Sequence, residues 1–325
     1  MRKNKKLIAL CGVVMAFAMI FTTAATPTMA ATSPRVTSSK SYYDYGNGWT
    51  LGATDNTTYS KSGVLQKTSY VAYDDGKKSY SSKTKYTYYK KGKFKGYTKT
   101  AVSTQKHDGT TTKTTSKYKY KKKGKTLTTT CKNYKGKKLS SKEVIKETFY
   151  DKSFTKIKQY DSKTYDSSNS LTSRYLYNYN KKGHTKNYKV WSSGSLQVKG
   201  SYSYNKKGKA VKGSYTTYND GGQTVHNVKY AYKNGYTIET VTNSDGTKDS
   251  KMKYKLDAAE NIVYDYTTNW SYTTDENGQT VTSKTTYKYK NTFYKKGAGK
   301  GCLKKSIMSI DGSPFYKVIY KYKKF

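Results

Sequence analysis

Few residues in this sequence could perform catalysis, and their spacing does not match a catalytic motif. The three histidines, His107, His184 and His226, lie beside or just beyond turn glycines. Several acidic residues, among them Asp75, Asp220, Asp245 and Asp311, also stand next to a turn glycine, where an aspartate side chain hydrogen-bonds its own turn. No metalloprotease, nucleophile-elbow or phosphate-loop motif occurs. We therefore predict no catalytic residue, no metal site and no cofactor, in a protein that is not an enzyme.

Positive charge is the dominant chemical feature of the chain. It has 63 Lys+Arg against 20 Asp+Glu, a formal net charge of +43. A field of this size gathers polyanions, and lysine is densest around Gly124. The candidate polyanion-binding residues are Lys119, Lys121, Lys122, Lys123 and Lys125. The alternative is structural, since lysine also solvates a sheet face and blocks edge pairing.

Aromatic side chains are the second group of residues that could bind a ligand. The three tryptophans, Trp49, Trp191 and Trp270, are candidates for stacking on a glycan. The 38 tyrosines recur at spacing two, as in Tyr202 and Tyr204. Such stripes serve either as contacts within a sheet or as stacking platforms for sugars or bases.

Two interleaved series of turns must position these side chains. A phrase of alternating tyrosines followed by Asn or Lys and then Gly ends at Gly183, Gly208 and Gly235, 25 and 27 residues apart. Asp-Gly and Ser-Gly turns lie between these points with the same period. Glycine after Asn or Asp supplies the positive φ that a tight hairpin requires.

The expected fold is all-β, a repetitive antiparallel hairpin meander of about 16–18 strands that is elongated, coiled or partly closed. Spacing two places the tyrosines on one face of each strand and Lys, Thr and Ser on the other. Residues 140–152 suit a strand better than a short helix, and 256–263 is interpreted as a divergent turn. Low aliphatic content excludes an ordinary leucine-cored enzyme.

The first 30 residues have the three parts of a secretory signal peptide, with a basic start, an apolar run and cleavage expected after Ala30. Residues 31–40 are expected to be a flexible mature N-terminus, and 41–325 a single β-repeat domain. Cys131 and Cys302 could pair outside the cytosol. No second apolar run of spanning length occurs, so the mature chain is expected to be secreted without a membrane span.

The repeated phrase Y-x-Y-N-K-K-G, followed by N-D-G or S-D-G, resembles the YD repeats of bacterial cell-surface and Rhs-type wall-associated proteins. The resemblance covers about 70–320. Asn180, Asn205 and Lys233 stand where that family carries aspartate. The resemblance implies β-hairpin repeats outside the cytoplasm and transfers no catalytic residue.

The predicted function is that of an exported cell-surface or matrix repeat protein. It would bind anionic wall polymer or glycan through a lysine-rich, tyrosine-laddered sheet and be held to the wall without a covalent bond. A secreted polycation that binds nucleic acid without sequence preference is one alternative, and a glycan hydrolase with an unrecognised site is another. The oligomeric state stays open.

Overall fold

The computed structural model describes residues 34–324 except 221, 257–261 and 275–278. Within these residues the chain is all-β, as expected, with 20 strands and no helix. No helix there is long and apolar enough to cross a membrane. The strands are β1 (Arg35–Asp44), β2 (Trp49–Tyr59), β3 (Leu65–Asp74), β4 (Lys77–Tyr88), β5 (Thr98–His107), β6 (Thr110–Lys123), β7 (Thr126–Lys135), β8 (Lys138–Phe149), β9 (Ile157–Asp166), β10 (Leu171–Tyr179), β11 (Thr185–Ser192), β12 (Ser195–Tyr204), β13 (Ala210–Asn219), β14 (Gly222–Lys233), β15 (Tyr236–Asn243), β16 (Lys248–Leu256), β17 (Ile262–Thr274), β18 (Thr280–Phe293), β19 (Leu303–Ile310) and β20 (Ser313–Lys323).

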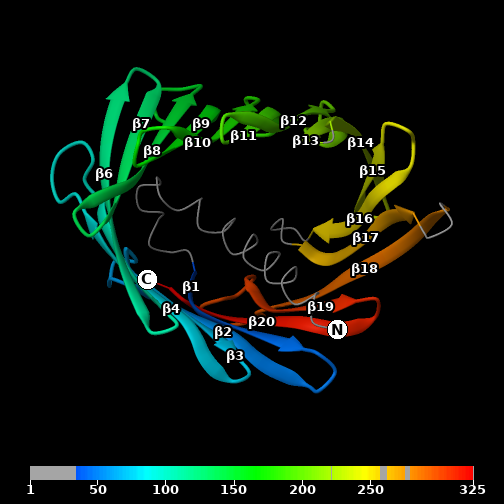
Figure 1. Ribbon diagram of the computed structural model, residues 1–325, viewed down its shortest axis with the longest axis horizontal. Helices are drawn as coiled ribbons and strands as arrows, with labels where there is room; N and C mark the ends of the chain where they lie inside the picture. Colours follow the sequence, from blue (N-terminus) through cyan, green and yellow to red (C-terminus); the bar gives the residue numbers. More distant parts are fainter. Residues whose placement is uncertain (1–33, 221, 257–261, 275–278, 325) are drawn as a thin grey trace.

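The sheet closes on itself into a barrel. Every strand pairs antiparallel with its neighbours in sequence, and the first strand also pairs with the last, for example at Lys40 and Ile319. Figure 1 shows the resulting ring, with the blue strands β1 and β2 beside the red strand β20. Closure leaves no unpaired edge, which removes the main aggregation hazard of a long meander.

The barrel corrects two details of the sequence analysis. It has 20 strands instead of 16–18, because the hairpins outside the regular repeats also form strands. Residues 35–40, expected to be flexible, belong to β1 and form part of the closing seam. The segment 140–152 is a strand over most of its length, as predicted. The signal peptide and most of the divergent turn lie outside the described residues.

The expectation of a mature chain without a membrane span is corrected by this closed architecture. That expectation rested on the lack of a continuous apolar run, which only a membrane-spanning helix needs. A closed barrel crosses a bilayer with tilted strands of about 9–11 residues. The strands here have 8–14 residues, and β4 and β6 have 12 and 14.

Tight turns join the strands in the way the Gly pattern predicts. Asp75 and Gly76 have φ values of 47° and 74°, and Asn234 and Gly235 have 52° and 74°. Positive φ at both central residues is the type I′ geometry, whose twist matches that of the flanking strands. The Asp-Gly and Asn-Gly pairs therefore fix where the strands that flank them end.

The two faces of the sheet differ in shielding. Opposed residues on neighbouring antiparallel strands share a face, and one face runs from Tyr120 through Thr129 and Ile145 to Ser162. It carries most of the buried residues among those described, including Ala53, Ala101, Leu127, Thr129, Cys131, Glu147, Ser162, Val228, Val241 and Val318. Side chains converge on the concave side of a closed sheet and diverge on the convex side. This shielded, tyrosine-rich face is therefore the inner face.

The barrel has no solid core. No large side chain among the described residues is fully buried, and the protein exposes 21994 Å². A compact monomer of this mass exposes about 14,000 Å². Barrels of 16 or more strands are also too wide for side chains to fill. The inner face therefore surrounds a lumen.

Tyrosine contacts replace a core. Along the inner face, the rings of Tyr160, Tyr177, Tyr188 and Tyr202 follow one another across β9–β12 at centroid separations of 5.7–6.4 Å. A second set of tyrosines lies near the ends of even-numbered strands. Their hydroxyl groups donate hydrogen bonds to backbone carbonyls at the start of the preceding strand. Tyr232 Oη, for example, donates to the Ala210 carbonyl at 2.8 Å. The repeat tyrosines thus connect neighbouring strands through ring contacts and hydrogen bonds.

A glycine beneath a tyrosine ring makes the packing of this ladder testable. Gly213 lies opposite Tyr202, and a Cβ at Gly213 would meet the Tyr202 ring at 2.6 Å and the Ser201 carbonyl oxygen at 2.8 Å. Because backbone cannot move aside, we expect Gly213→Ala to destabilise the protein by about 1–3 kcal/mol. Ser214→Ala, on the other face of β13, should change stability by less than about 0.5 kcal/mol. Equal thermal melting of the two variants would contradict this packing.

Candidate functional site

The candidate site is the lumen face, because the carboxylates of the strands gather there among tyrosines. Register places them on the same face as the tyrosine ladder. The inner carboxylates are Asp55, Glu143, Glu147, Glu239 and Asp265. None of them adjoins a turn glycine. This separation from glycine distinguishes the five inner carboxylates from the turn aspartates. It is the one signal in the sequence by which they could have been recognised.

Each inner carboxylate lies against tyrosine or serine. Glu143 accepts a hydrogen bond from Ser162 Oγ at 2.8 Å. Glu147, opposite Tyr160, is only 8% exposed, and desolvation raises the pKa of its carboxyl. Asp265 lies opposite Tyr254 and Tyr289, and burial likewise raises its pKa. A bound cation would restore favourable interactions to these carboxylates that burial has removed.

Close by, Cys131 and Tyr118 face one another on β7 and β6. Burial raises the pKa of the Cys131 thiol to about 11, so this cysteine is a poor nucleophile. Cys131 and Cys302 are both free thiols. The possible pairing of the two is therefore absent from the structure.

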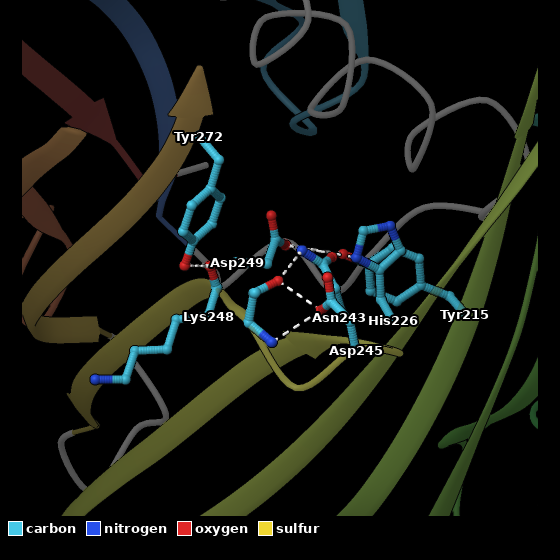
Figure 2. A network of polar contacts seen from close by, with 8 residues as sticks. Tyr215, His226, Asn243, Asp245, Lys248, Asp249 and Tyr272 are labelled. Carbon is cyan, nitrogen blue, oxygen red and sulfur yellow. Dashed lines mark hydrogen bonds and ion pairs between the residues drawn. The ribbon is translucent and has the colours of Figure 1, made fainter. Parts of the chain in front are cut away.

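A second inner group lies on β13, β14 and β16 (Figure 2). The His226 ring stacks on Tyr215 with centroids 4.4 Å apart, and Tyr215 Oη donates to Asp249 at 3.4 Å. In Figure 2 both rings extend from the green strands toward the space inside the barrel. His226 Nδ1 is 3.8 Å from the Asp249 carboxylate, which is too long for a hydrogen bond. This group adds a carboxylate and an imidazole to the lumen without forming a catalytic pair.

In the part of the chain that the structure describes, no three His, Cys, Asp or Glu side chains come together as a metal site. His107 and His184 lie apart from His226, at the end of β5 and in the linker before β11.

Lysine occupies the opposite, outer face of the same strands. Lys119 and Lys121 on β6 and Lys251 and Lys253 on β16 are examples, with register partners that place them away from the tyrosine ladder. Lysine at a lipid-facing position costs about 2–4 kcal/mol at the bilayer midplane. The outer face thus differs from the apolar belt of typical membrane barrels. Most strand lysines therefore lie outside, with Lys122 on the inner face as an exception, and most mid-strand carboxylates lie inside, with Asp161 on the outer face as an exception.

The predicted polyanion-binding lysines do not form one surface. Lys119, Lys121 and Lys123 point outward from β6, whereas Lys122 shares the inner face with Leu127 and lies 4.4 Å from the centre of the Phe154 ring. Lys125 donates to the Tyr150 carbonyl at 2.7 Å. Because successive side chains of β6 point to opposite faces, the predicted lysines are divided between the two faces.

The three tryptophans lie on the outer face, and each is covered by a cation. Lys317 Nζ lies 4.2 Å from the Trp49 ring centre, the Arg174 guanidinium carbon 4.9 Å from that of Trp191, and Lys248 Nζ 5.7 Å from that of Trp270. Arg174 is also held by both carboxylate oxygens of Asp161. One face of each ring is thus occupied within the protein, and glycan stacking on them stays a prediction.

These geometries define the class of the molecule as a hollow, closed antiparallel β-barrel. No protein-family model matches the sequence, and no curated protein matches it. The resemblance to YD repeats therefore stays a prediction. Among solved structures, a porin-like protein from Bacteroides uniformis ATCC 8492 is similar over 92% of this chain and 100% of its own, with 10% identity and a TM-score of 0.32. That weak likeness carries no functional argument, and the barrel rests on the strand pairing of this chain.

The predicted function as a wall-polymer or glycan binder is overturned by the closed barrel. That function used the lysine-rich, tyrosine-laddered sheet as a surface on which a polymer lies. In the barrel the ladder lines the lumen, where an extended surface polymer cannot lie along it. The expectation of an anionic wall polymer as partner is corrected with it.

Proposed function

We propose that this protein is an exported, non-enzymatic barrel that retains cationic solutes in its lumen. The observation that supports the proposal is the uneven division of strand charge. Asp55, Glu143, Glu147, Glu239 and Asp265 lie inside, whereas most strand lysines lie outside. Export rests on the signal-peptide pattern of the first 30 residues.

The lumen favours cations for two physical reasons. Carboxylates on low-dielectric walls focus a negative potential into the enclosed space, and rings of Asp and Glu select cations in channels. Tyrosine faces also attract ammonium and guanidinium groups, by about 0.5–2 kcal/mol each. A solute with several spaced ammonium groups, such as a polyamine, satisfies both kinds of contact at once.

The test is equilibrium dialysis of the protein with spermidine in dilute solution. The lumen variant converts the five inner carboxylates to amides as Asp55→Asn, Glu143→Gln, Glu147→Gln, Glu239→Gln and Asp265→Asn. A matched control makes the same change in charge at turns, as Asp75→Asn, Asp108→Asn, Asp220→Asn, Asp245→Asn and Asp311→Asn. We expect the lumen variant to lose spermidine affinity at least tenfold and the control to stay within about twofold.

Two results would overturn the proposal. One is equal loss of affinity in both variants, which would assign binding to net charge. The other is a native protein that retains spermidine no better than citrate, an anion of similar size. In planar bilayers the same lumen predicts currents carried by potassium in preference to chloride, and an anion-selective current would contradict it.

A further inference from the structure

The linkers at the two ends of the barrel carry opposite charge. Because consecutive strands are antiparallel neighbours, the linkers alternate between the ends. The basic rim comprises the linkers that follow even-numbered strands, and the acidic rim those that follow odd-numbered strands. Among the described linker residues, the basic rim has 16 lysines and one aspartate, whereas the acidic rim has five aspartates and one lysine.

The basic-rim lysines are Lys61, Lys90, Lys91, Lys93, Lys95, Lys125, Lys152, Lys156, Lys181, Lys182, Lys206, Lys207, Lys209, Lys295, Lys296 and Lys300. The acidic-rim aspartates are Asp75, Asp108, Asp220, Asp245 and Asp311.

The charges of each rim stand at exposed hairpin tips. Asp108 occupies a two-residue turn with its side chain 80% exposed, and Asp75 and Asp311 occupy turns of the same kind. On the basic rim, Lys90, Lys91 and the other tip lysines are exposed as well. Because these side chains are exposed, they can meet charges on another molecule.

The rims also match in shape, because both are ends of the same closed ring of 20 strands. Hairpin tips repeat every second strand, roughly 10 Å apart around each rim. A basic rim placed on an acidic rim therefore brings tips of opposite sign into repeated register. Two like rims would instead place charges of the same sign together.

We propose that the acidic rim of one barrel docks on the basic rim of a second copy. This contact is heterologous, so it leaves a free rim at each end and extends into a row of barrels with aligned lumens. Each exposed ion pair contributes at most about 1 kcal/mol, so stability depends on many tips engaging together.

Net charge opposes this contact at long range, because each copy carries +43 in total. At about 0.15 M salt the screening length is about 8 Å, which weakens repulsion between distant outer lysines more than attraction between touching tips. We therefore expect association to peak near physiological salt. It should decline at about 0.01 M salt through repulsion and at about 1 M through loss of the ion pairs.

The deciding experiment is complementation between two variants, measured by analytical ultracentrifugation at about 0.15 M salt. The acid-neutral variant carries Asn at Asp75, Asp108, Asp220, Asp245 and Asp311, and Asn suits these tight turns. The base-neutral variant carries Gln at each of the 16 basic-rim lysines. Circular dichroism of each checks that strand content is unchanged.

Each variant alone should sediment as a monomer, and an equal mixture should form a species of two barrels and nothing larger. The native protein should form longer rows as its concentration rises. A native protein that stays monomeric across this salt range, or variants that assemble as well as the native chain, would overturn head-to-tail docking. So would a mixture that remains monomeric.

Discussion

A disulfide between cysteines placed at Lys40 and Ile319 is expected to form within one molecule and to raise the melting temperature by about 10 °C. These residues are direct partners on β1 and β20, where the barrel closes. Opposed Cα atoms in antiparallel pairs lie about 4.5–5.5 Å apart, which is within disulfide range. The bond would close a loop of nearly the whole chain, and the chain-entropy model gives about 5 kcal/mol for loops of this size.

The measurement combines non-reducing electrophoresis, mass spectrometry of the linked peptide and thermal melting with and without reductant. The control is Lys40→Cys with Lys189→Cys, since Lys189 lies on β11, which pairs with β10 and β12. A pair at β1 and β20 that links only between molecules would show that the sheet is open. Equal linkage in the control would show that the seam is not specific.

Acidification is expected to release cationic solutes from the lumen before it unfolds the barrel. Burial raises the pKa of Glu147 and of Asp265, so these carboxyls take up protons at a higher pH than ordinary ones, whose pKa is about 4. A protonated carboxyl no longer attracts an ammonium group. Spermidine affinity should therefore fall tenfold or more between about pH 7 and about pH 4.

Folding stability should move in the opposite direction over the same range. A group whose pKa is higher in the folded state binds more protons there, so protonation of Glu147 and Asp265 stabilises the fold as pH falls through their raised values toward about 4. Turn aspartates behave differently. Hydrogen bonds hold the pKa of Asp151 down to about 2 and also lower those of Asp166 and Asp245, so their stabilising contribution is lost only at lower pH.

Dialysis and thermal melting along one pH series check both parts. Asp55→Asn, Glu147→Gln and Asp265→Asn together change the three inner carboxylates whose pKa burial raises. This variant should lose the fall in affinity that occurs above about pH 4, while the low-pH unfolding stays in place. Loss of affinity that coincides with unfolding, or a pH dependence that survives in this variant, would show that these carboxyls do not control retention.

The local sequence determined the strands and turns of this protein. Asp75-Gly76 and Asn234-Gly235 adopt the positive φ pairs that their residue types favour, and the alternating tyrosines lie on one face. Both features depend on neighbours within a few residues, which is why the all-β meander could be predicted. The strand character of 140–152 followed from the same alternation.

The site was not predictable to the same degree, because it depends on which face becomes the inside. Alternation separated Tyr120 from Lys121 but gave no sign of the direction in which the sheet would curve. Glu147 and Asp265 lie 118 residues apart in the chain, and nothing local relates them. The run from Lys119 to Lys125 does not form one surface for a related reason, since successive residues along a strand point to opposite faces.

Sequence alone thus determined the repeating hairpin, the division of tyrosine from lysine and the opposite composition of the two turn series, since each is a matter of short-range chemistry. Only the tertiary structure decided that these features form a closed ring with a carboxylate-bearing lumen and two oppositely charged rims. Closure requires β1 to meet β20 across nearly 280 residues. That contact depends on the twist accumulated over all 20 strands, which no short segment encodes.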